Sequence, residues 1–350
     1  MNIHGRSGRS AAAGILGLLM GVGACTDLEE TPVSAITPNN FYQTEQEVMG
    51  GLASVYAGLR SSLWAYYNLS EVTTDEIVVP TRGNDWFDGG RWLELHRQTW
   101  SATTPAAEDI NAAWNDAFTG VARANVLLTA LEDVPVAGKE VVQAEVRTLR
   151  AFYYYMLMDM FGGVPIVETT DIAVRPRNSR AEVFDFIEAE LLAAREILPA
   201  RWPDNLHGRM TKGAADAILA SIYLNAEVFT GTVSTAGLQR GTARWTDAIA
   251  AADRILNSGE YSLAADWGAN FRADNHLSPE NILVVKLLNQ EGIGFEMIYR
   301  GLHYNSGAGG AWNGFSTLAE TYYAFDTLTV ETLRAQLGRE PRQRGEAKSE

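Results

Sequence analysis

The segment of residues 144–167, AEVRTLRAFYYYMLMDMFGGVPIV, constrains the fold of this chain more than any other. The apolar positions in it and just before it are three or four residues apart, which places them on one stripe of an α-helix: Val142, Val146, Leu149, Tyr153, Met156 and Met160. The helix is predicted to end at Gly162 and Gly163, since glycine adopts the left-handed conformation of a helix C-terminus. Pro165 then keeps residues 164–167 extended. Because this helix is so apolar, it is predicted to lie in the core, with neighbouring helices packed on it.

The charge and cysteine content exclude some classes of protein. The 350 residues are 46% hydrophobic, which is enough for a sizeable core in one or two domains. The formal net charge is −15, or −17 once a leader with Arg6 and Arg9 is removed. So acidic a chain repels phosphate backbones, which argues against nucleic-acid binding. The single cysteine cannot form an internal disulfide.

The N-terminus has the features of a bacterial lipoprotein leader. Arg6 and Arg9 precede the apolar run of residues 11–22, which is too short to span a bilayer permanently. The sequence VGAC at residues 22–25 resembles the lipoprotein processing box, in which small residues precede a cysteine. Cleavage before Cys25 and acylation of its thiol would anchor the chain without a spanning helix. A plain secretory signal is the alternative.

Helix start signals recur along the rest of the chain. A capping box, in which Ser or Thr is followed three residues later by Glu, occurs at Thr44 and at Ser179. Thr211 is a further predicted N-cap, and Thr104-Pro105 predicts a helix start because proline is favoured at the first helical position. The pattern of Trp245–Leu256 predicts another helix.

The predicted fold class is mostly α, with helix pairs stacked as in tetratricopeptide repeats and an irregular, loop-rich ligand-binding part. Pairs of amphipathic helices need a neighbour to bury their apolar faces, so they stack into a scaffold, although no strict repeat period is visible. The β-branched run of residues 281–287 predicts a short strand. The Gly-rich, aromatic residues 292–314 predict a long loop.

Four motifs, in order, resemble those of the SusD/RagB family of outer-membrane nutrient-binding lipoproteins. LRAFYY and the exit FGGVP, in the segment described first, resemble the family's signature helix. The other three are MTKGAADAILASIYLNAEVF at 210–229, the helix with its SGEYSL exit at 245–263, and NGFSTLAE at 313–320. Members of the family are mostly α-helical, with repeat-like helix pairs.

The resemblance implies a cell-surface lipoprotein of the outer membrane, lipid-anchored and facing the exterior. It implies that the chain binds oligosaccharide nutrients and delivers them to a TonB-dependent, SusC-like transporter, without enzymatic activity. The sequence indicates no cofactor and no metal site. Peptide capture, as in RagB-like members, a glycoside hydrolase and an inactive truncated fragment are the alternatives. No zinc-binding HExxH helix, GxSxG elbow or phosphate loop is present in the sequence, but the many carboxylates allow a chance pair at glycosidase separation.

The resemblance also sets the expected domain boundaries. Residues 1–24 are the lipoprotein signal peptide, and residues 25–43 are an acidic tether. The SusD-like helical domain covers residues 44–330 and is expected to be incomplete at its C-terminus, because family members continue well beyond the NGFST motif. The charged residues 331–350 predict a disordered tail.

Tryptophans in polar loops indicate the ligand site. Residues 77–101 hold several large aromatics among Gly, Asp, Asn and Arg. An aromatic face packs on the apolar face of a pyranose, while neighbouring polar groups bond its hydroxyls. In the family, a variable loop at this point and the loop before NGFST form the ligand platform. A structural role, in which the rings fasten the loops to the scaffold, is the alternative and is favoured for Trp312. The predicted ligand-binding residues are Arg82, Asn84, Asp85, Trp86, Trp92, His303, Tyr304, Asn305 and Trp312.

Overall fold

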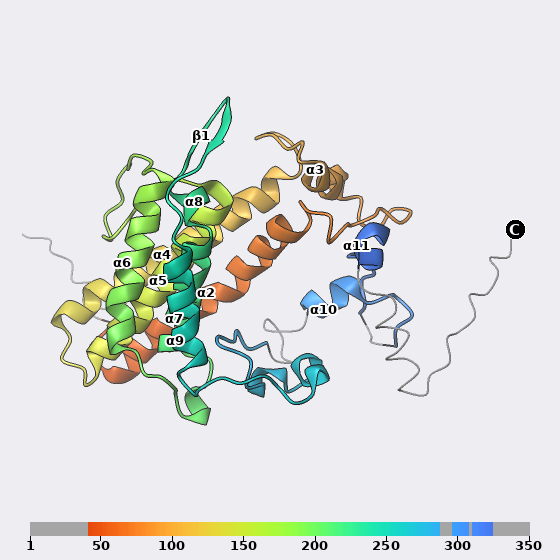
Figure 1. Cartoon of the computed structure of the whole chain (residues 1–350). Helices are drawn as coiled ribbons and strands as arrows, with labels where there is room; N and C mark the ends of the chain where they lie inside the picture. Colours follow the sequence, from red (N-terminus) through yellow and green to blue (C-terminus); the bar gives the residue numbers. More distant parts are fainter. Residues whose placement is uncertain (1–40, 288–295, 308–309, 325–350) are drawn as a thin grey trace, which may run out of the picture. The chain divides into compact units, whose positions relative to one another are not determined.

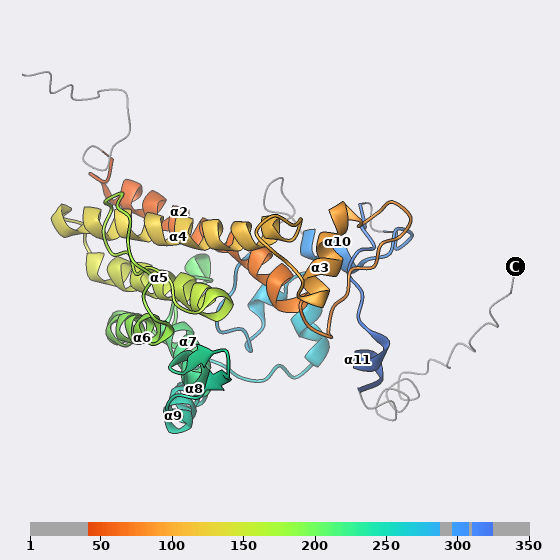
Figure 2. The same ribbon diagram turned by 90° about the horizontal axis from the view of Figure 1, so that it is seen from above.

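The structure, a computed structural model, describes residues 41–287, 296–307 and 310–324. Long helices dominate this part of the chain (Figure 1), and each packs on the next in sequence order (Figure 2). They are α2 (Glu45–Glu71), α4 (Ala107–Asp133), α5 (Lys139–Phe161), α6 (Arg180–Ile197), α7 (Lys212–Leu224) and α9 (Trp245–Leu256). The mostly α, repeat-like fold predicted from the sequence is confirmed. The predicted leader, Cys25, residues 25–40 of the tether and the tail of residues 331–350 lie outside the described residues.

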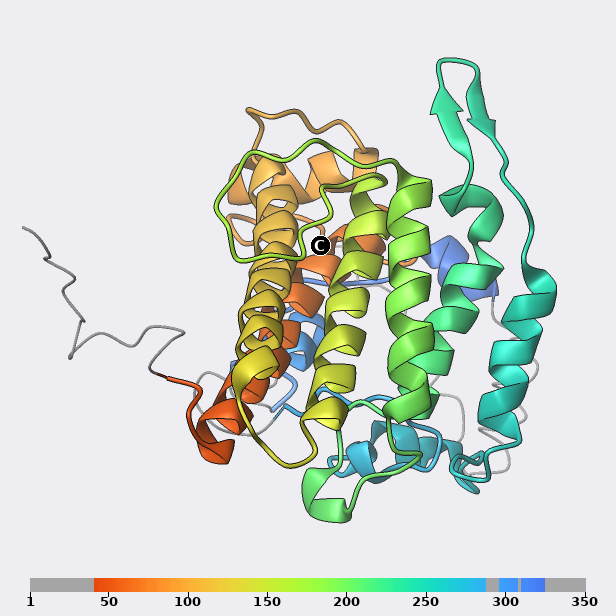
Figure 3. The same ribbon diagram turned by 90° about the vertical axis from the view of Figure 1, so that its left-hand side faces the viewer.

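Shorter elements connect and flank the long helices. The antiparallel hairpin of β1 (Thr232–Ser234) and β2 (Gly237–Gln239) places Val233 opposite Leu238 and projects beyond the ends of the helices (Figure 3). No helix of the described segments is long and apolar enough to cross a membrane. The remaining elements are α3 (Arg91–Arg97), α8 (Ala226–Phe229), α10 (Glu296–Gly301), α11 (Ala319–Ala324), and the 3₁₀ segments η1 (Asp88–Gly90), η2 (Asp204–Leu206), η3 (Trp267–Phe271) and η4 (Asn275–Leu277).

The helix termini test the capping predictions. Thr44 and Ser179 each form the full capping box, and the Thr211 hydroxyl accepts from the amide of Ala214, so these three N-caps are confirmed. The helix start at Thr104 is wrong. Its hydroxyl accepts from the Ser101 amide at 2.9 Å and so closes the preceding turn, and α4 begins only at Ala107.

Two predictions for the C-terminal part are also wrong. Residues 281–287 form no strand, and the chain bends at residues 282 and 283. Leu283 and Val285 pack on the helical core, and the surrounding helices offer no edge with which a strand could pair. The loop expected at residues 292–314 contains the short helix α10.

Helix α5 is the centre of the core, as its apolar stripe predicted. Tyr153 and Tyr154 are fully buried, and the Tyr153 hydroxyl donates to the main-chain oxygen of Val55 in α2 at 2.6 Å. The Tyr153 ring also fills the space beside Gly120 of α4, where any Cβ atom would overlap it. One aromatic side chain therefore sets the distance between α2, α4 and α5. At the other end, α5 stops at Gly162 with a φ of 73°, as predicted.

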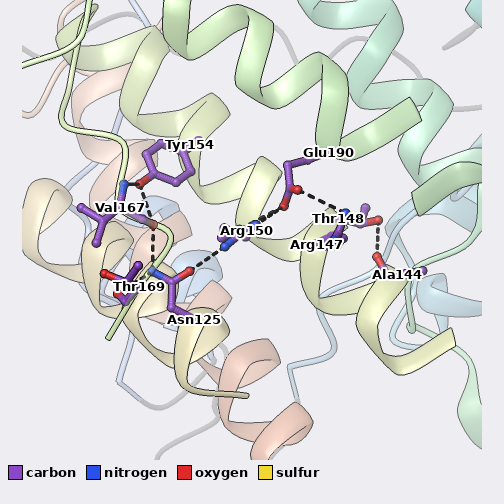
Figure 4. A network of polar contacts seen from close by, with 9 residues as sticks. All are labelled: Asn125, Ala144, Arg147, Thr148, Arg150, Tyr154, Val167, Thr169 and Glu190. Atoms are coloured by element: carbon purple, nitrogen blue, oxygen red, sulfur yellow. Dashed lines mark hydrogen bonds and ion pairs between the residues drawn. The ribbon is translucent and has the colours of Figure 1, made fainter. Parts of the chain in front are cut away.

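A buried polar network holds the chain that leaves α5 (Figure 4). Arg150 donates to Glu190 of α6 at 2.6 and 3.0 Å and to the side-chain oxygen of Asn125 in α4 at 2.7 Å. Asn125 donates in turn to the main-chain oxygen of Val167, whose amide donates to the Tyr154 hydroxyl at 2.7 Å. These bonds fix the extended exit segment against three helices.

A second, smaller core joins the end of α2 to the segments around residues 80–95 and 312–316. The buried side chains of Val72, Val79 and Phe315 belong to it. An antiparallel bridge pairs Val78 with Ser316, so the two distant segments also share main-chain hydrogen bonds. This small core supports the candidate site.

Candidate functional site

The structure brings together the two segments in which the sequence placed the ligand site. The indole Nε1 of Trp86 donates to the main-chain oxygen of Trp312 at 2.8 Å. The phenolic hydroxyl of Tyr304 donates to the carboxylate of Asp85 at 2.5 Å, which raises the pKa of the phenol. Both bonds cross from the loop after α2 to the chain around α10, so the loops form one surface.

The remaining predicted polar residues lie at the edge of this surface. The Arg82 guanidinium donates to the Gly314 oxygen at 3.1 Å and to the Ser316 hydroxyl at 2.9 Å, so it fastens the two loops together. Asn84, His303 and Asn305 are exposed. Their binding of a ligand stays a prediction.

The loop location expected for Trp92 is wrong. Trp92 lies on α3 and is only 3% exposed, and its indole Nε1 donates to Asp88 at 2.7 Å. The turn of η1 into α3 brings its ring against Phe315, with the ring centroids 5.5 Å apart. Trp92 is therefore part of a buried wall and not an exposed platform.

A cavity of about 340 Å³ lies behind the joined loops. It is bounded by the C-terminal half of α2, the N-terminal half of α4, α3 and the segment around Arg300. Four tryptophans line it, and we call it the tryptophan cavity: Trp64, Trp86, Trp92 and Trp312. The rings of Trp64 and Trp86 each lie 6.4 Å from that of Trp312, centroid to centroid.

The backbone is strained where it borders this cavity. Trp86, Asp88 and Asn313 have φ values of 60°, 42° and 49°, in the left-handed region that side chains other than glycine rarely adopt. Such residues concentrate at functional sites, because the surrounding packing must hold them in place. Here the Trp86–Trp312 hydrogen bond and the ring contacts hold Trp86 in place.

A chain of polar contacts forms the floor of the cavity. The Arg300 guanidinium lies 3.2 Å above the Trp64 ring centroid and donates to Asn68, which donates to Asp109 at 2.9 Å. Burial lowers the pKa of Arg300 to about 10, so it stays charged at neutral pH. The Nε atom of Arg91 and the Oδ2 atom of Asp109 form an ion pair at 3.8 Å, and neither atom has a hydrogen bond among the described residues. The floor thus carries charged groups that pair with each other without a close hydrogen bond.

The α4 side of the cavity carries two further carboxylates. Glu108 accepts from Arg91 at 3.2 Å and is largely exposed. Asp116 is half-buried, and it has no hydrogen-bond or ion-pair partner among the described residues. Burial raises the pKa of Asp116. Asp116 is therefore an acceptor available to a hydroxyl in the cavity.

Sequence reasoning missed most of the polar lining. A signal was present on α2, whose buried stripe runs from large apolar residues to Ser62, Ala65 and Asn68. Small and polar residues on an otherwise apolar stripe indicate that the helix faces something other than a packed core. Arg300 carried no such signal, since only the fold brings it to Trp64. The missed residues are Trp64, Asn68, Arg91, Glu108, Asp109, Asp116 and Arg300.

The site is suited to non-covalent binding of a hydroxyl-rich ligand. Its volume falls in the range of small-molecule pockets, about 300–1,000 Å³, and its aromatic walls offer faces for sugar rings. Within the described segments no group of three or more His, Cys, Asp or Glu side chains could hold a metal ion.

Comparisons with known proteins bear on this arrangement. A SusD-like family model, described as "Starch-binding associating with outer membrane", matches residues 28–224, which is more than half of the chain. The chain is 28% identical over 212 residues to a SusD-like protein of Bacteroides ovatus, covering 57% of this chain and 36% of that protein. It is 26% identical over 233 residues to the starch-binding protein SusD of Bacteroides thetaiotaomicron, covering 65% and 38%. The chain thus spans less than half the length of these curated relatives.

Solved structures share the fold. A laminarin-binding SusD-like protein superimposes with a TM-score of 0.68 at 23% identity, over 84% of this chain and 66% of that one. Surface glycan-binding protein A from Bacteroides fluxus gives a TM-score of 0.67 at 22% identity, over 81% and 62%. With the family model, the signature helix α5 and this shared fold in agreement, the chain belongs to the SusD-like family.

Proposed function

We propose that this protein binds neutral oligosaccharides in the tryptophan cavity. The proposal rests on one observation: four tryptophans and Asp116, a carboxylate with no partner among the described residues, line one cavity of about 340 Å³. Tryptophan faces take up the apolar faces of sugar rings, while carboxylates accept hydrogen bonds from hydroxyls. The name of the family model and the glycan-binding solved relatives support the same ligand class.

The charges of the lining favour neutral glycans over acidic ones. Glu108, Asp109 and Asp116 stand against Arg91 and Arg300, and Arg91 is already shared between two of these carboxylates. An acidic sugar would bring a further negative charge next to Asp116, at a cost in desolvation and repulsion. Neutral hydroxyls avoid that cost.

The wider role is proposed from family membership. The protein would be anchored in the outer membrane through acylated Cys25, after removal of residues 1–24, with residues 25–43 as a tether to the helical domain. It would pass its ligand to a SusC-like, TonB-dependent transporter. The family model's description, which places its members at the outer membrane, supports this location. Release of a Cys25→Ser variant from the membrane fraction, with loss of acyl labelling, tests the anchor.

Calorimetric titration of the chain from Cys25 onward with maltoheptaose and laminariheptaose tests the binding. Trp64→Ala and Trp312→Ala should each weaken binding by about 1–3 kcal/mol, by analogy with other aromatic stacking contacts. Trp267→Ala is the matched control, because Trp267 is 74% exposed and outside the cavity. If all three variants lose affinity equally, or if Trp64→Ala and Trp312→Ala lose none, the glycan site lies elsewhere.

One observation favours glycoside hydrolysis as a second candidate. Asp109 and Asp116 line the same cavity in different environments, since Asp109 is hydrogen-bonded to Asn68 whereas burial raises the pKa of Asp116. Glycosidases likewise use two carboxylates held in different environments. A binding protein should release no reducing ends from maltoheptaose, and their appearance, lost in Asp116→Asn, would establish hydrolysis. If a peptide binds the protein and neither glucan binds it, peptide capture is favoured instead.

A further inference from the structure

A second cleft, of about 340 Å³, shares no lining residue with the tryptophan cavity. It lies between the N-terminal half of α2 and two later segments, residues 207–209 and 284–286. Apolar side chains from α2 and from residues 284–285 supply most of its surface, among them Met49, Ala53 and Val284. The cleft is therefore separate from the proposed glycan site.

The charged groups of this cleft are all of one sign. Arg60, His207, Arg209 and Lys286 line it, and its described lining contains no Asp or Glu. Arg209 is already neutralised, because it pairs with the fully buried Glu145. Arg60 and Lys286 form no ion pair with any residue in the described ranges. Two uncompensated cations thus face an apolar cleft in a chain whose net charge is −15.

One of these cations lies beside the backbone of residue 208. Gly208 has a φ of 101°, and the Lys286 Cε atom lies 3.7 Å from the position that a Cβ atom on Gly208 would take. The alkyl chain of Lys286 therefore passes Gly208, and its ammonium group is near enough to His207 for its charge to lower the pKa of the imidazole. The Nδ1 atom of His207 is buried and has no hydrogen-bond partner among the residues described.

We propose that this cleft binds a soluble organic anion with an apolar body. The apolar walls would take up the body of the ligand, and Arg60 and Lys286 would bind its anionic group. Partly buried ion pairs are screened less than exposed ones, so an anion gains more here than on the open surface. A neutral sugar would form no ion pair with the two cations. A polar anion without an apolar tail would leave the apolar walls exposed to water.

Binding should strengthen as the pH falls. Burial lowers the pKa of His207, and Lys286, His276 and Arg201 lower it further, whereas Asp204 opposes them. A bound anion adds negative charge beside the imidazole and so raises its pKa. The complex therefore holds a proton more tightly than the free protein, and affinity increases as pH falls through the pKa of His207 in the complex.

Titration of the full chain with octane-1-sulfonate tests the proposal, because a sulfonate stays ionised across the pH range. Octan-1-ol supplies the tail without the charge, and methanesulfonate supplies the charge without the tail. Both should bind on the order of tenfold more weakly or worse, and maltoheptaose should not compete. Equal binding of octanol and octane-1-sulfonate would overturn the proposal, as would no binding of the sulfonate. Adsorption to phosphatidylglycerol vesicles alone would also overturn it, because the cleft would then recognise a bilayer surface.

Variants locate the binding. The double variant Arg60→Gln with Lys286→Gln should lose on the order of tenfold in affinity. Arg97→Gln with Lys212→Gln, an equal change of charge outside the cleft, should bind like the wild type. Ala53→Phe fills the cleft from an exposed position on α2 and should abolish binding with the charges intact. Unchanged affinity in the first variant or in Ala53→Phe, at unchanged melting temperature, would refute the assignment.

Discussion

The indole Nε1 of Trp86 donates to the main-chain oxygen of Trp312 at 2.8 Å, although 226 residues separate the two tryptophans. The Trp86 ring also lies directly over Gly314, so that a side chain at this glycine would overlap it. The tryptophan cavity is thus closed by one hydrogen bond and by one close approach of ring to backbone. The close approach at Gly314 can be tested without removing a group that lines the cavity.

Gly314→Ala should displace the Trp86 ring, because the new Cβ atom would lie closer to the ring than real Cβ contacts allow. Overpacking of this kind destabilises a protein by about 1–3 kcal/mol. We expect a loss of that size in urea unfolding, together with weaker binding of maltoheptaose. Gly50→Ala, where nothing lies within 4 Å of the new atom, is the control. It should be neutral or stabilising by up to about 1 kcal/mol, since alanine favours a helix.

Asp116→Asn should stabilise the fold at neutral pH and weaken glycan binding. Burial raises the pKa of Asp116, so the folded chain holds this proton more tightly than the unfolded chain. The contribution of Asp116 to stability therefore falls as pH rises through the raised pKa, and the ionised form is the unfavourable one. Unfolding in urea should be measured at several pH values from about 3 to 7, a range that begins below the ordinary aspartate pKa of about 3.9. The unfolding free energy of the variant should exceed that of the wild type by an amount that grows with pH. A constant difference would contradict this linkage.

Glu145→Gln should be strongly destabilising. Glu145 is fully buried between Arg209 and the Tyr56 hydroxyl, which donates to it at 2.7 Å. Removing one partner of a buried ion pair leaves the other charge uncompensated and costs about 3–5 kcal/mol. Glu196→Gln is the control, because Glu196 pairs with Arg195 but its side chain is 72% exposed. The unfolding free energy of this variant should stay within about 0.5 kcal/mol of the wild type. Similar values for both variants in urea unfolding would contradict the assignment of Glu145 to the core.

Tyr153→Phe should cost about 1 kcal/mol in unfolding free energy, since it removes a buried hydrogen bond and keeps the ring. The bond runs from the Tyr153 hydroxyl to the oxygen of Val55. Tyr322 is 53% exposed, and Tyr322→Phe should leave the melting temperature unchanged. An equal loss of unfolding free energy in both variants, or no loss in either, would contradict a specific contribution of the hydrogen bond between α2 and α5.

The sequence predicted the parts of the fold that depend on neighbouring residues. The capping boxes at Thr44 and Ser179 and the end of α5 at Gly162 are local chemistry, and the structure has them as predicted. The prediction failed at Thr104, because two hydrogen bonds tie its hydroxyl to Ser101 in the preceding turn. It failed again at residues 281–287, because a β-branched run forms a strand only beside another strand.

The candidate site could be predicted only in part, for a physical reason. The loops around Trp86 and Tyr304 were identified from aromatic residues in polar surroundings, and the structure joins them. The polar floor depends on contacts such as that of Arg300 with Asn68, which lie 232 residues apart. No local pattern reports such a contact, and the burial of Trp92 likewise follows from the distant Phe315.

The bridge between Val78 and Ser316 has a consequence for how the protein is made. The helices from α2 to α9 pack on neighbours in sequence, so they can form in order as the chain leaves the ribosome. The tryptophan cavity cannot, because Arg300 and Trp312 come long after the other residues of its lining, so that a long loop has to close. A growing chain that has just completed α9 can therefore hold its helical scaffold but not a closed cavity.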